Sequence, residues 1–140
     1  MLARLLMMFS LMLGGSAFLL SNSASAMVKE TTVDAALMKK INPDGDGTVD
    51  LAEAKAAGKA MFKQLNPDKD GTLDMNELKG RISEADFKAA NPDGDGTLDM
   101  DEYMALIEKL FNEANPDDDG TLDENELKSP AGQKLLALIA

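Results

Sequence analysis

The chain has 140 residues, with 25 acidic and 14 basic side chains and a net charge of −11 at pH 7. This length and balance predict one small acidic domain, and the lack of a basic patch argues against nucleic acid as a partner. The absence of Cys and His excludes disulfides, zinc sites, thiol nucleophiles and imidazole bases, and leaves oxygen ligands for metal chemistry.

Residues 1–26 have the pattern of a secretory signal peptide. Arg4 precedes an apolar run of about 16 residues, and the small polar segment after it ends in an A-x-A pattern at Ala24 and Ala26. An uncleaved membrane anchor is the alternative, but the run is shorter than the ~20 residues that a spanning helix needs. We expect cleavage after Ala26, export to the periplasm of a Gram-negative cell, and no membrane attachment after cleavage.

A flexible tail at 27–32 and a first helix are predicted next. Thr31 to Asp34 fit a capping box, and Val33, Leu37 and Ile41 then fall on one helical face. This helix leads into the first of four repeats.

The repeats share the pattern N-P-D-x-D-G-T-[VL]-D-x-x-E. They are loop 1 (42–53), loop 2 (66–77), loop 3 (91–102) and loop 4 (115–126). Oxygen side chains at positions 1, 3, 5, 9 and 12 around a glycine at position 6 have the EF-hand spacing for a hard cation. Asn-Pro and Asp-Gly also form ordinary turns, but four copies in register favour metal binding.

The predicted ligands stand at positions 1, 3, 5, 7, 9 and 12, with the backbone carbonyl acting at position 7. They are Asn42, Asp44, Asp46, Thr48, Asp50 and Glu53 in loop 1; Asn66, Asp68, Asp70, Thr72, Asp74 and Glu77 in loop 2; Asn91, Asp93, Asp95, Thr97, Asp99 and Glu102 in loop 3; and Asn115, Asp117, Asp119, Thr121, Asp123 and Glu126 in loop 4.

The short spacers between loops constrain the fold. Only 12 or 13 residues separate successive loops. One helix must therefore be shared by loops 1 and 2, and another by loops 3 and 4. A helix of about 12 residues is ~18 Å long, which keeps loop 1 from loop 2 and loop 3 from loop 4. We therefore expect loop 2 to pair with loop 3 and loop 1 with loop 4, through short strands at position 8.

Two segments break this pattern. Gly80 and a second capping box, from Ser83 to Asp86, predict two short helices with a turn between them, and Ser129 with Pro130 starts a final helix. Residues 33–140 are thus predicted to form one all-α domain built from a unit that occurs twice.

Charge predicts that folding depends on metal. The leader holds one basic and no acidic residue, so the mature chain has 13 basic and 25 acidic residues, a net charge of −12. Clustered carboxylates repel one another, and a small domain with few aromatic residues has little apolar burial to offset that repulsion. The metal-free chain is expected to be loose and to order on binding.

The leader, the four loops with Pro at position 2 and Asp at position 9, and the short spacers together resemble the lanmodulin family. The resemblance covers about 33–140, including the LKGRISEAD connection and the SPAGQKL segment near the end. It implies a compact three-helix-type bundle with four peripheral EF-hand loops joined by short shared helices. It also implies a periplasmic protein of methylotrophic bacteria, not an enzyme, that binds up to four lanthanide(III) ions selectively over calcium and takes part in lanthanide uptake, trafficking or storage.

One departure from the family is Asn in place of the usual Asp at position 1 of the loops. Each site loses a negative charge, so the affinity for every cation should fall, and the preference for trivalent over divalent ions should become smaller. Asp at position 9 acts in the opposite direction, because it replaces a bound water with a charged oxygen.

Two other functions remain open. The loop ligands alone also fit an exported calcium buffer or sensor, with calcium as the ligand. A protein-docking module similar to the dockerins is the other alternative. We expect metal ions as partners, transient contacts with lanthanide-dependent periplasmic enzymes or transporters, and a monomer, with a dimer as the alternative.

Overall fold

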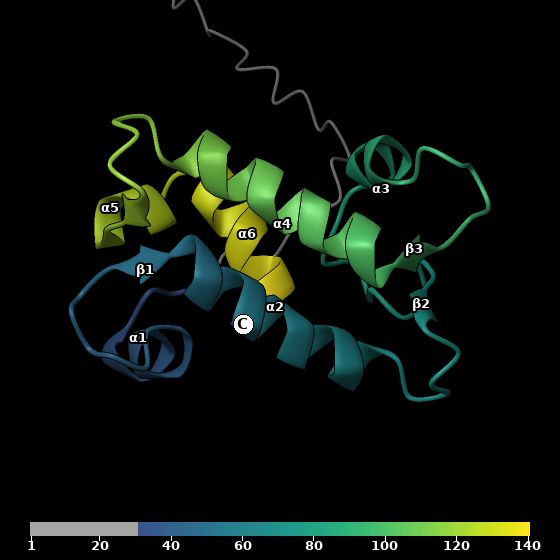
Figure 1. The fold of residues 1–140 in the computed structure, drawn as a ribbon, viewed down its shortest axis with the longest axis horizontal. Coiled ribbons are helices and arrows are strands. Elements are labelled where there is room, and N and C mark those ends of the chain that lie inside the picture. The colour runs from purple at the N-terminus through teal and green to yellow at the C-terminus, as the bar shows by residue number, and fades with distance from the viewer. Residues whose placement is uncertain (1–30) are drawn as a thin grey trace, which may run out of the picture.

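The computed structural model of the protein describes residues 31–140 (Figure 1). The signal peptide predicted at 1–26 and the tail up to residue 30 lie outside the described residues. About half of the described residues are helical, in the six helices α1 (Ala35–Ile41), α2 (Leu51–Leu65), α3 (Glu84–Ala90), α4 (Met100–Ala114), α5 (Glu124–Leu127) and α6 (Pro130–Ile139). Four two-residue strands complete the secondary structure: β1 (Val49–Asp50), β2 (Thr72–Leu73), β3 (Leu98–Asp99) and β4 (Thr121–Leu122).

The predicted loop pairing is confirmed. β1 pairs antiparallel with β4, with Val49 opposite Leu122, and β2 pairs antiparallel with β3, with Leu73 opposite Leu98. The long helices α2 and α4 separate the two pairs, which therefore lie at opposite ends of the molecule (Figure 1). These four position-8 side chains are fully buried, so each strand pair also anchors its loops to the core.

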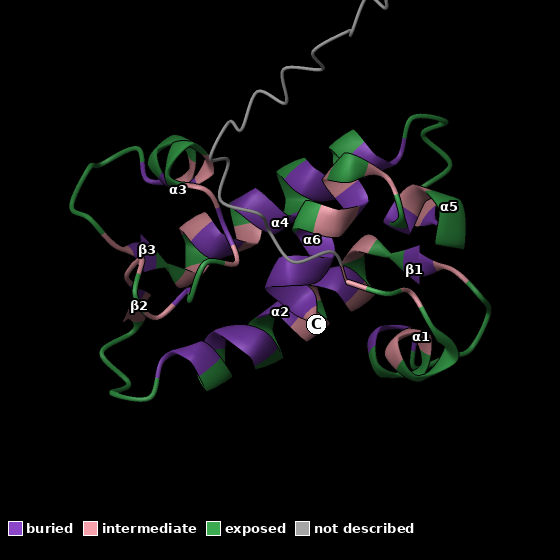
Figure 2. Ribbon diagram, turned by 180° about the vertical axis from the view of Figure 1, so that it is seen from behind, coloured by how far each residue is buried: buried purple, intermediate pink, exposed green. Residues whose placement is uncertain are grey.

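The centre of the molecule is formed by α2, α4 and α6, which pack on one another. Their inward faces are buried, whereas the loops around them are exposed (Figure 2). Phe62 of α2 meets Tyr103 of α4 edge to face, with ring centroids 5.4 Å apart and an interplanar angle of 74°. Gly58 lets α2 approach α4 closely, since a Cβ there would lie 2.1 Å from Ile107 Cδ1.

The C-terminal end of α6 is held by side chains that follow loops 2 and 3. Arg81 Nη1 donates to the carbonyl oxygens of Ala137 and Ala140 at 2.8 and 3.3 Å. The buried Tyr103 hydroxyl donates to the Leu138 carbonyl at 2.6 Å. These bonds satisfy carbonyl groups that a helix end leaves without an internal partner.

The N-terminal end of α6 is held against loop 4 and the start of the described chain. Gln133 Nε2 donates to the carbonyl oxygens of Leu127 and Thr31, at 3.1 and 3.0 Å, and the Thr31 N–H donates back to Gln133 Oε1 at 2.7 Å. Helix α6 thus contacts the flanks of both loop pairs.

Two local expectations were wrong. The first helix is capped by Asp34, whose side chain accepts from the Leu37 N–H at 2.8 Å, and not by a box beginning at Thr31. The middle connection contains only one helix, α3, because Lys79 and Gly80 take φ values of +49° and +73° and end the turn after loop 2.

Across residues 31–140, no helix combines the length and apolar character needed to cross a bilayer.

Candidate metal sites in four acidic loops

Each loop begins at an asparagine that ends the helix before it. Asn42, Asn66, Asn91 and Asn115 stand at the C-caps of α1, α2, α3 and α4 and are only 4–8% exposed. They are the buried polar residues of the part of the chain that the structure describes. Burying a polar side chain has a cost unless a partner satisfies it, so the hydrogen-bond partners of these four amides show which of their oxygens are available to a ligand.

The aspartates at positions 3 and 5 fold the loop onto its own backbone. The position-5 carboxylate accepts from the N–H and the hydroxyl of the position-7 threonine, as Asp46 does from Thr48 at 2.8 and 2.9 Å. Loops 2, 3 and 4 repeat this arrangement at Asp70, Asp95 and Asp119. The position-3 carboxylates, those of Asp44, Asp68, Asp93 and Asp117, accept from the position-5 N–H at 3.2–3.3 Å.

At position 6 the backbone turns through the left-handed region. Gly47, Gly71, Gly96 and Gly120 have φ values of +89° to +96°, which glycine adopts without strain. A side chain at this position would resist the turn that wraps the loop.

The aspartate at position 9 and the glutamate at position 12 form a reciprocal cap. Asp50 Oδ1 accepts from the Glu53 N–H at 2.7 Å, and Glu53 Oε2 accepts from the Asp50 N–H at 3.0 Å. Asp74 with Glu77, Asp99 with Glu102 and Asp123 with Glu126 repeat the arrangement. The position-9 side chain therefore has a structural role besides its predicted ligand role, because it caps the segment that follows the loop.

Three buried oxygen atoms at predicted ligand positions have no hydrogen-bond partner among residues 31–140. They are Glu53 Oε1 in loop 1, Asn66 Oδ1 in loop 2 and Asn115 Oδ1 in loop 4. A buried acceptor left unpaired is unfavourable by about 1–3 kcal/mol. A hard cation bound in the loop would satisfy such oxygens, so the donor set fits an ion of this class.

The charges of the loop carboxylates respond to these surroundings. Hydrogen bonds from Thr48 hold the pKa of Asp46 below its usual value, and those from Thr97 do the same for Asp95. Burial raises the pKa of Glu53, and the carboxylates of Asp44, Asp50 and Asp46 add to the effect. Repulsion from neighbouring carboxylates thus adds to the effect of burial at Glu53, and a bound cation would relieve it.

The structure keeps each predicted set of six ligands in its own loop and brings the loops together in pairs. Within 31–140, no three acidic side chains converge closely enough to form a ready-made metal cluster. The carboxylates bond to backbone N–H groups of their own loops instead. Binding would therefore require these side chains to turn inward from a loop whose backbone is already bent.

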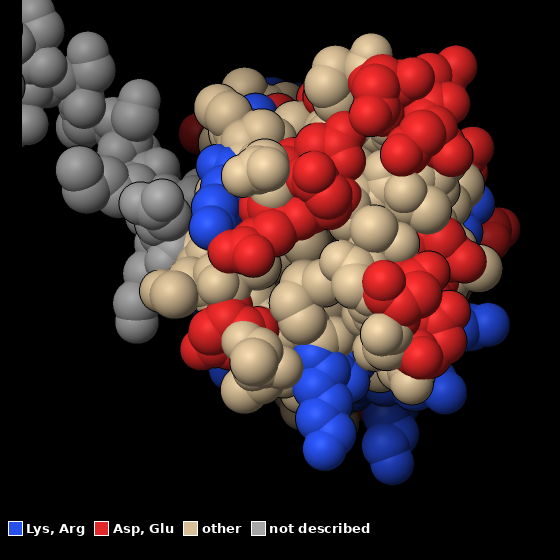
Figure 3. All heavy atoms as spheres, turned by 90° about the vertical axis from the view of Figure 1, so that its left-hand side faces the viewer, with Lys and Arg blue, Asp and Glu red and all other residues tan. Residues whose placement is uncertain are grey.

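Acidic side chains gather on the end of the molecule that carries loops 1 and 4 (Figure 3). Loop 4 contributes six acidic residues and loop 1 contributes four. Such a concentration of like charge attracts cations and destabilises the compact chain without them.

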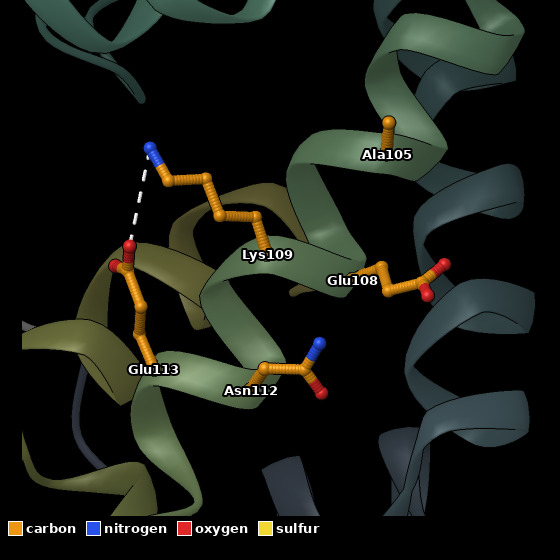
Figure 4. Close-up of a pocket in the computed structure, with 5 residues that line it drawn as sticks. All are labelled: Ala105, Glu108, Lys109, Asn112 and Glu113. Carbon is orange, nitrogen blue, oxygen red and sulfur yellow. Dashed lines mark ion pairs between the residues drawn. The ribbon is translucent and has the colours of Figure 1, made fainter.

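A surface hollow on α4 lies away from the loops and offers no comparable chemistry. Ala105, Glu108, Lys109, Asn112 and Glu113 line it (Figure 4). Lys109 pairs with Glu113 at 3.9 Å, and Glu108 pairs with Lys55 of α2 at 2.6 Å. These are solvated ion pairs of the kind that helix surfaces carry.

Sequence reasoning gave no role to position 4 of the loops. Lys69 and Asp118 occupy it in loops 2 and 4 with φ values of +60° and +57°, where loops 1 and 3 have glycine. The signal was present in the sequence, because position 4 reads Gly, Lys, Gly and Asp, whereas positions 1–9 otherwise repeat apart from Val or Leu at position 8.

Comparison with known proteins gives one informative similarity. No protein-family model matches the chain. Over 64 residues the chain is 56% identical to lanmodulin of Methylorubrum extorquens, an alignment that includes 46% of this chain and 48% of lanmodulin. The chain thus spans about half the length of the curated relative it matches, and over that half its sequence is lanmodulin-like.

Proposed function

We propose that this is an exported metal-binding protein whose four loops are EF-hand sites for lanthanide(III) ions and whose domain, residues 33–140, orders when they bind. The observation that carries the proposal is the set of buried, unpaired oxygens at predicted ligand positions: Glu53 Oε1, Asn66 Oδ1 and Asn115 Oδ1. All three stand in loops that supply only oxygen donors, which suit a hard cation. The similarity to lanmodulin supports the same class of ligand.

The chain's own residues supply three functions in this proposal. The position-6 glycines and position-5 aspartates bend the loop. The reciprocal hydrogen bonds between positions 9 and 12 cap the segment that follows the loop. The unpaired oxygens and the second oxygens of the carboxylates bind the ion. Strand pairing then couples loop 1 to loop 4 and loop 2 to loop 3.

Selectivity for trivalent ions is assigned to the carboxylates. The attraction of each carboxylate scales with the charge of the ion, so four per loop favour a trivalent over a divalent ion of similar size. Calcium binding is the second candidate function, favoured by the asparagines at position 1, which leave each loop one charge short of an all-carboxylate set.

The deciding experiment is far-ultraviolet circular dichroism of the mature chain, titrated separately with buffered free lanthanum and free calcium. Helicity that rises at free lanthanum orders of magnitude below the calcium required supports the lanthanide function. Responses to both ions in the micromolar range or above, typical of calcium sensors and extracellular sites, would make the protein an exported calcium binder.

A companion variant tests the charge argument. Changing Asp50, Asp74, Asp99 and Asp123 together to Asn removes four charges yet keeps good helix-capping residues in place. Lanthanum binding should weaken far more than calcium binding. Equal losses for the two ions would contradict the assignment of selectivity to these carboxylates.

A further inference from the structure

The four loops are of two kinds. In loops 1 and 3, position 4 is glycine, and its N–H donates to the position-1 asparagine: Gly45 to Asn42 Oδ1 at 2.7 Å and Gly94 to Asn91 Oδ1 at 2.8 Å. The asparagine oxygen of these loops is therefore already engaged with the loop backbone.

In loops 2 and 4 this bond is missing. Position 4 is Lys69 or Asp118, and the Oδ1 atoms of Asn66 and Asn115 have no partner within 31–140 although the two residues are only 6% and 8% exposed. In loop 2 the asparagine and the lysine line one cavity of about 360 Å³. In loop 2 the position-4 residue thus borders the same cavity as the asparagine with the unpaired oxygen.

Pairing places one loop of each kind at each end of the molecule. Loop 2, with Lys69, pairs with loop 3, and loop 4, with Asp118, pairs with loop 1. Loop 2 has four acidic residues and one lysine, a net charge of −3, whereas loop 4 has six acidic residues and no basic one, a net charge of −6. The two loops with an unpaired asparagine oxygen therefore differ in net charge, and the sign of the position-4 residue accounts for two of the three charges between them.

Resting on the proposed function, we propose that Lys69 and Asp118 are specificity-determining residues that make the four sites unequal. Loop 4 discriminates most strongly in favour of trivalent over divalent ions, and loop 2 discriminates least. A fixed charge near a site acts on a trivalent ion one and a half times as strongly as on a divalent ion, so position 4 tunes charge selectivity and not affinity alone.

The test is the double exchange Lys69→Asp with Asp118→Lys. It leaves the net charge unchanged, and each position already accommodates positive φ with a non-glycine residue. Every loop also carries its own reporter, the amide of the position-6 glycine, which ¹H–¹⁵N NMR resolves separately for Gly47, Gly71, Gly96 and Gly120. The full mature chain is titrated with chelator-buffered free lanthanum and, separately, with free calcium.

In the native chain, the ratio of lanthanum to calcium affinity should be highest at Gly120 and lowest at Gly71. For charges on the order of 8 Å apart in water at about 0.1 M salt, the exchange should tighten lanthanum at loop 2 about tenfold and weaken it at loop 4 about tenfold. The calcium midpoints should move about fivefold in the same directions. The midpoints read at Gly47 and Gly96 should change much less.

Neutral variants separate charge from backbone effects. Lys69→Asn and Asp118→Asn both place asparagine, which tolerates the left-handed region, at position 4. The charge explanation predicts that the first tightens loop 2 and the second weakens loop 4, each by about half of the logarithmic effect of the exchange. Shifts of the same sign would indicate a backbone effect and overturn the proposal.

The outcomes distinguish this inference from the proposed function. If lanthanum acts far below calcium but the site order survives the exchange, only the role of position 4 fails. If lanthanum and calcium act at similar concentrations, the lanthanide function fails, while the calcium midpoints at Gly71 and Gly120 still test whether position 4 sets site strength. If none of the four glycine amide signals responds to lanthanum or to calcium, both the proposed function and the role of position 4 are overturned.

Discussion

At the scale of single residues, the position-1 asparagines carry more information than the conspicuous carboxylates. The aspartates at positions 3, 5 and 9 all find N–H partners inside their own loops, and these hydrogen bonds support the bend of the loop backbone. Asn66 and Asn115 do not, although they are nearly buried. A side chain that is buried and left unpaired identifies a ligand position better than an exposed charge does.

Asn66→Asp tests this at one site. The substitution adds a carboxylate at a buried, unpaired ligand position, so lanthanum affinity at loop 2 should rise by roughly tenfold or more, and calcium affinity by less. Asn76→Asp is the matched control, because it adds the same charge to the exposed position 11 of the same loop. The Gly71 amide reports both; equal gains from the two variants would mean that only the overall loop charge matters.

At the scale of elements, close packing of α6 is the main structural constraint. A Cβ on Gly132 would lie 2.2 Å from the Glu126 carbonyl oxygen and 2.6 Å from Leu127 Cα, both of them backbone atoms. Helix α6 therefore presses directly on the last residue of loop 4. Gly58 makes an equally close approach between α2 and α4, but there the neighbour is the tip of the Ile107 side chain.

These two helical glycines should respond differently to alanine. Gly132→Ala has to displace backbone and should lower the free energy of unfolding by about 2–3 kcal/mol. Gly58→Ala only has to move the end of a side chain, and alanine's better helix propensity, worth about 1 kcal/mol, offsets part of that cost. Urea unfolding in saturating lanthanum measures both; a larger loss at Gly58 would show that the Ile107 side chain cannot adjust.

Much of this arrangement follows from sequence, because it depends on local periodicity and length. The repeat spacing leaves room for only one helix on each side of the middle connection, and that alone fixes which loops pair. The segment after loop 2 was not predictable in the same way. There, Lys79 and Gly80 have left-handed backbone conformations. The corresponding Lys128 after loop 4 has a right-handed helical conformation, with φ −81°, and α5 ends at the residue before it.

Long-range contacts account for the other differences from the sequence-based prediction. Thr31, expected to cap the first helix, instead exchanges backbone hydrogen bonds with the side chain of Gln133, 102 residues away. No local pattern contains such a contact. The predicted ligand positions come from spacing alone, whereas the position-9 capping role depends on a side-chain orientation that spacing does not specify.

At the scale of the whole molecule, charge is distributed as two acidic ends joined by an apolar centre. The carboxylates of loops 1 and 4 crowd one end (Figure 3), and those of loops 2 and 3 lie at the other. Repulsion within each end opposes the packing of α2, α4 and α6. Cations should therefore act on stability in two ways, by specific binding and by general screening.

Monovalent salt separates these two effects. Raising sodium chloride from about 20 mM to about 500 mM shortens the Debye length to a few ångströms and should increase the helicity and melting temperature of the chelator-treated chain. The same change should weaken lanthanum binding, because it screens the attraction as well. Circular dichroism in both conditions measures the two effects; a chelator-treated chain whose helicity and melting temperature do not respond to salt would contradict a destabilising role for this repulsion.

Tyr103 gives the molecule an internal optical reporter. It is the only tyrosine in a chain without tryptophan, it is fully buried, and burial raises its pKa far above the usual 10. The folded state therefore favours the neutral phenol, a contribution to stability that is complete below pH 10 and fades as the pH rises toward the folded-state pKa. In alkaline solution, the ultraviolet absorbance of the Tyr103 phenolate would then report how often the core opens. An ion that stabilises the folded chain would slow the appearance of that absorbance.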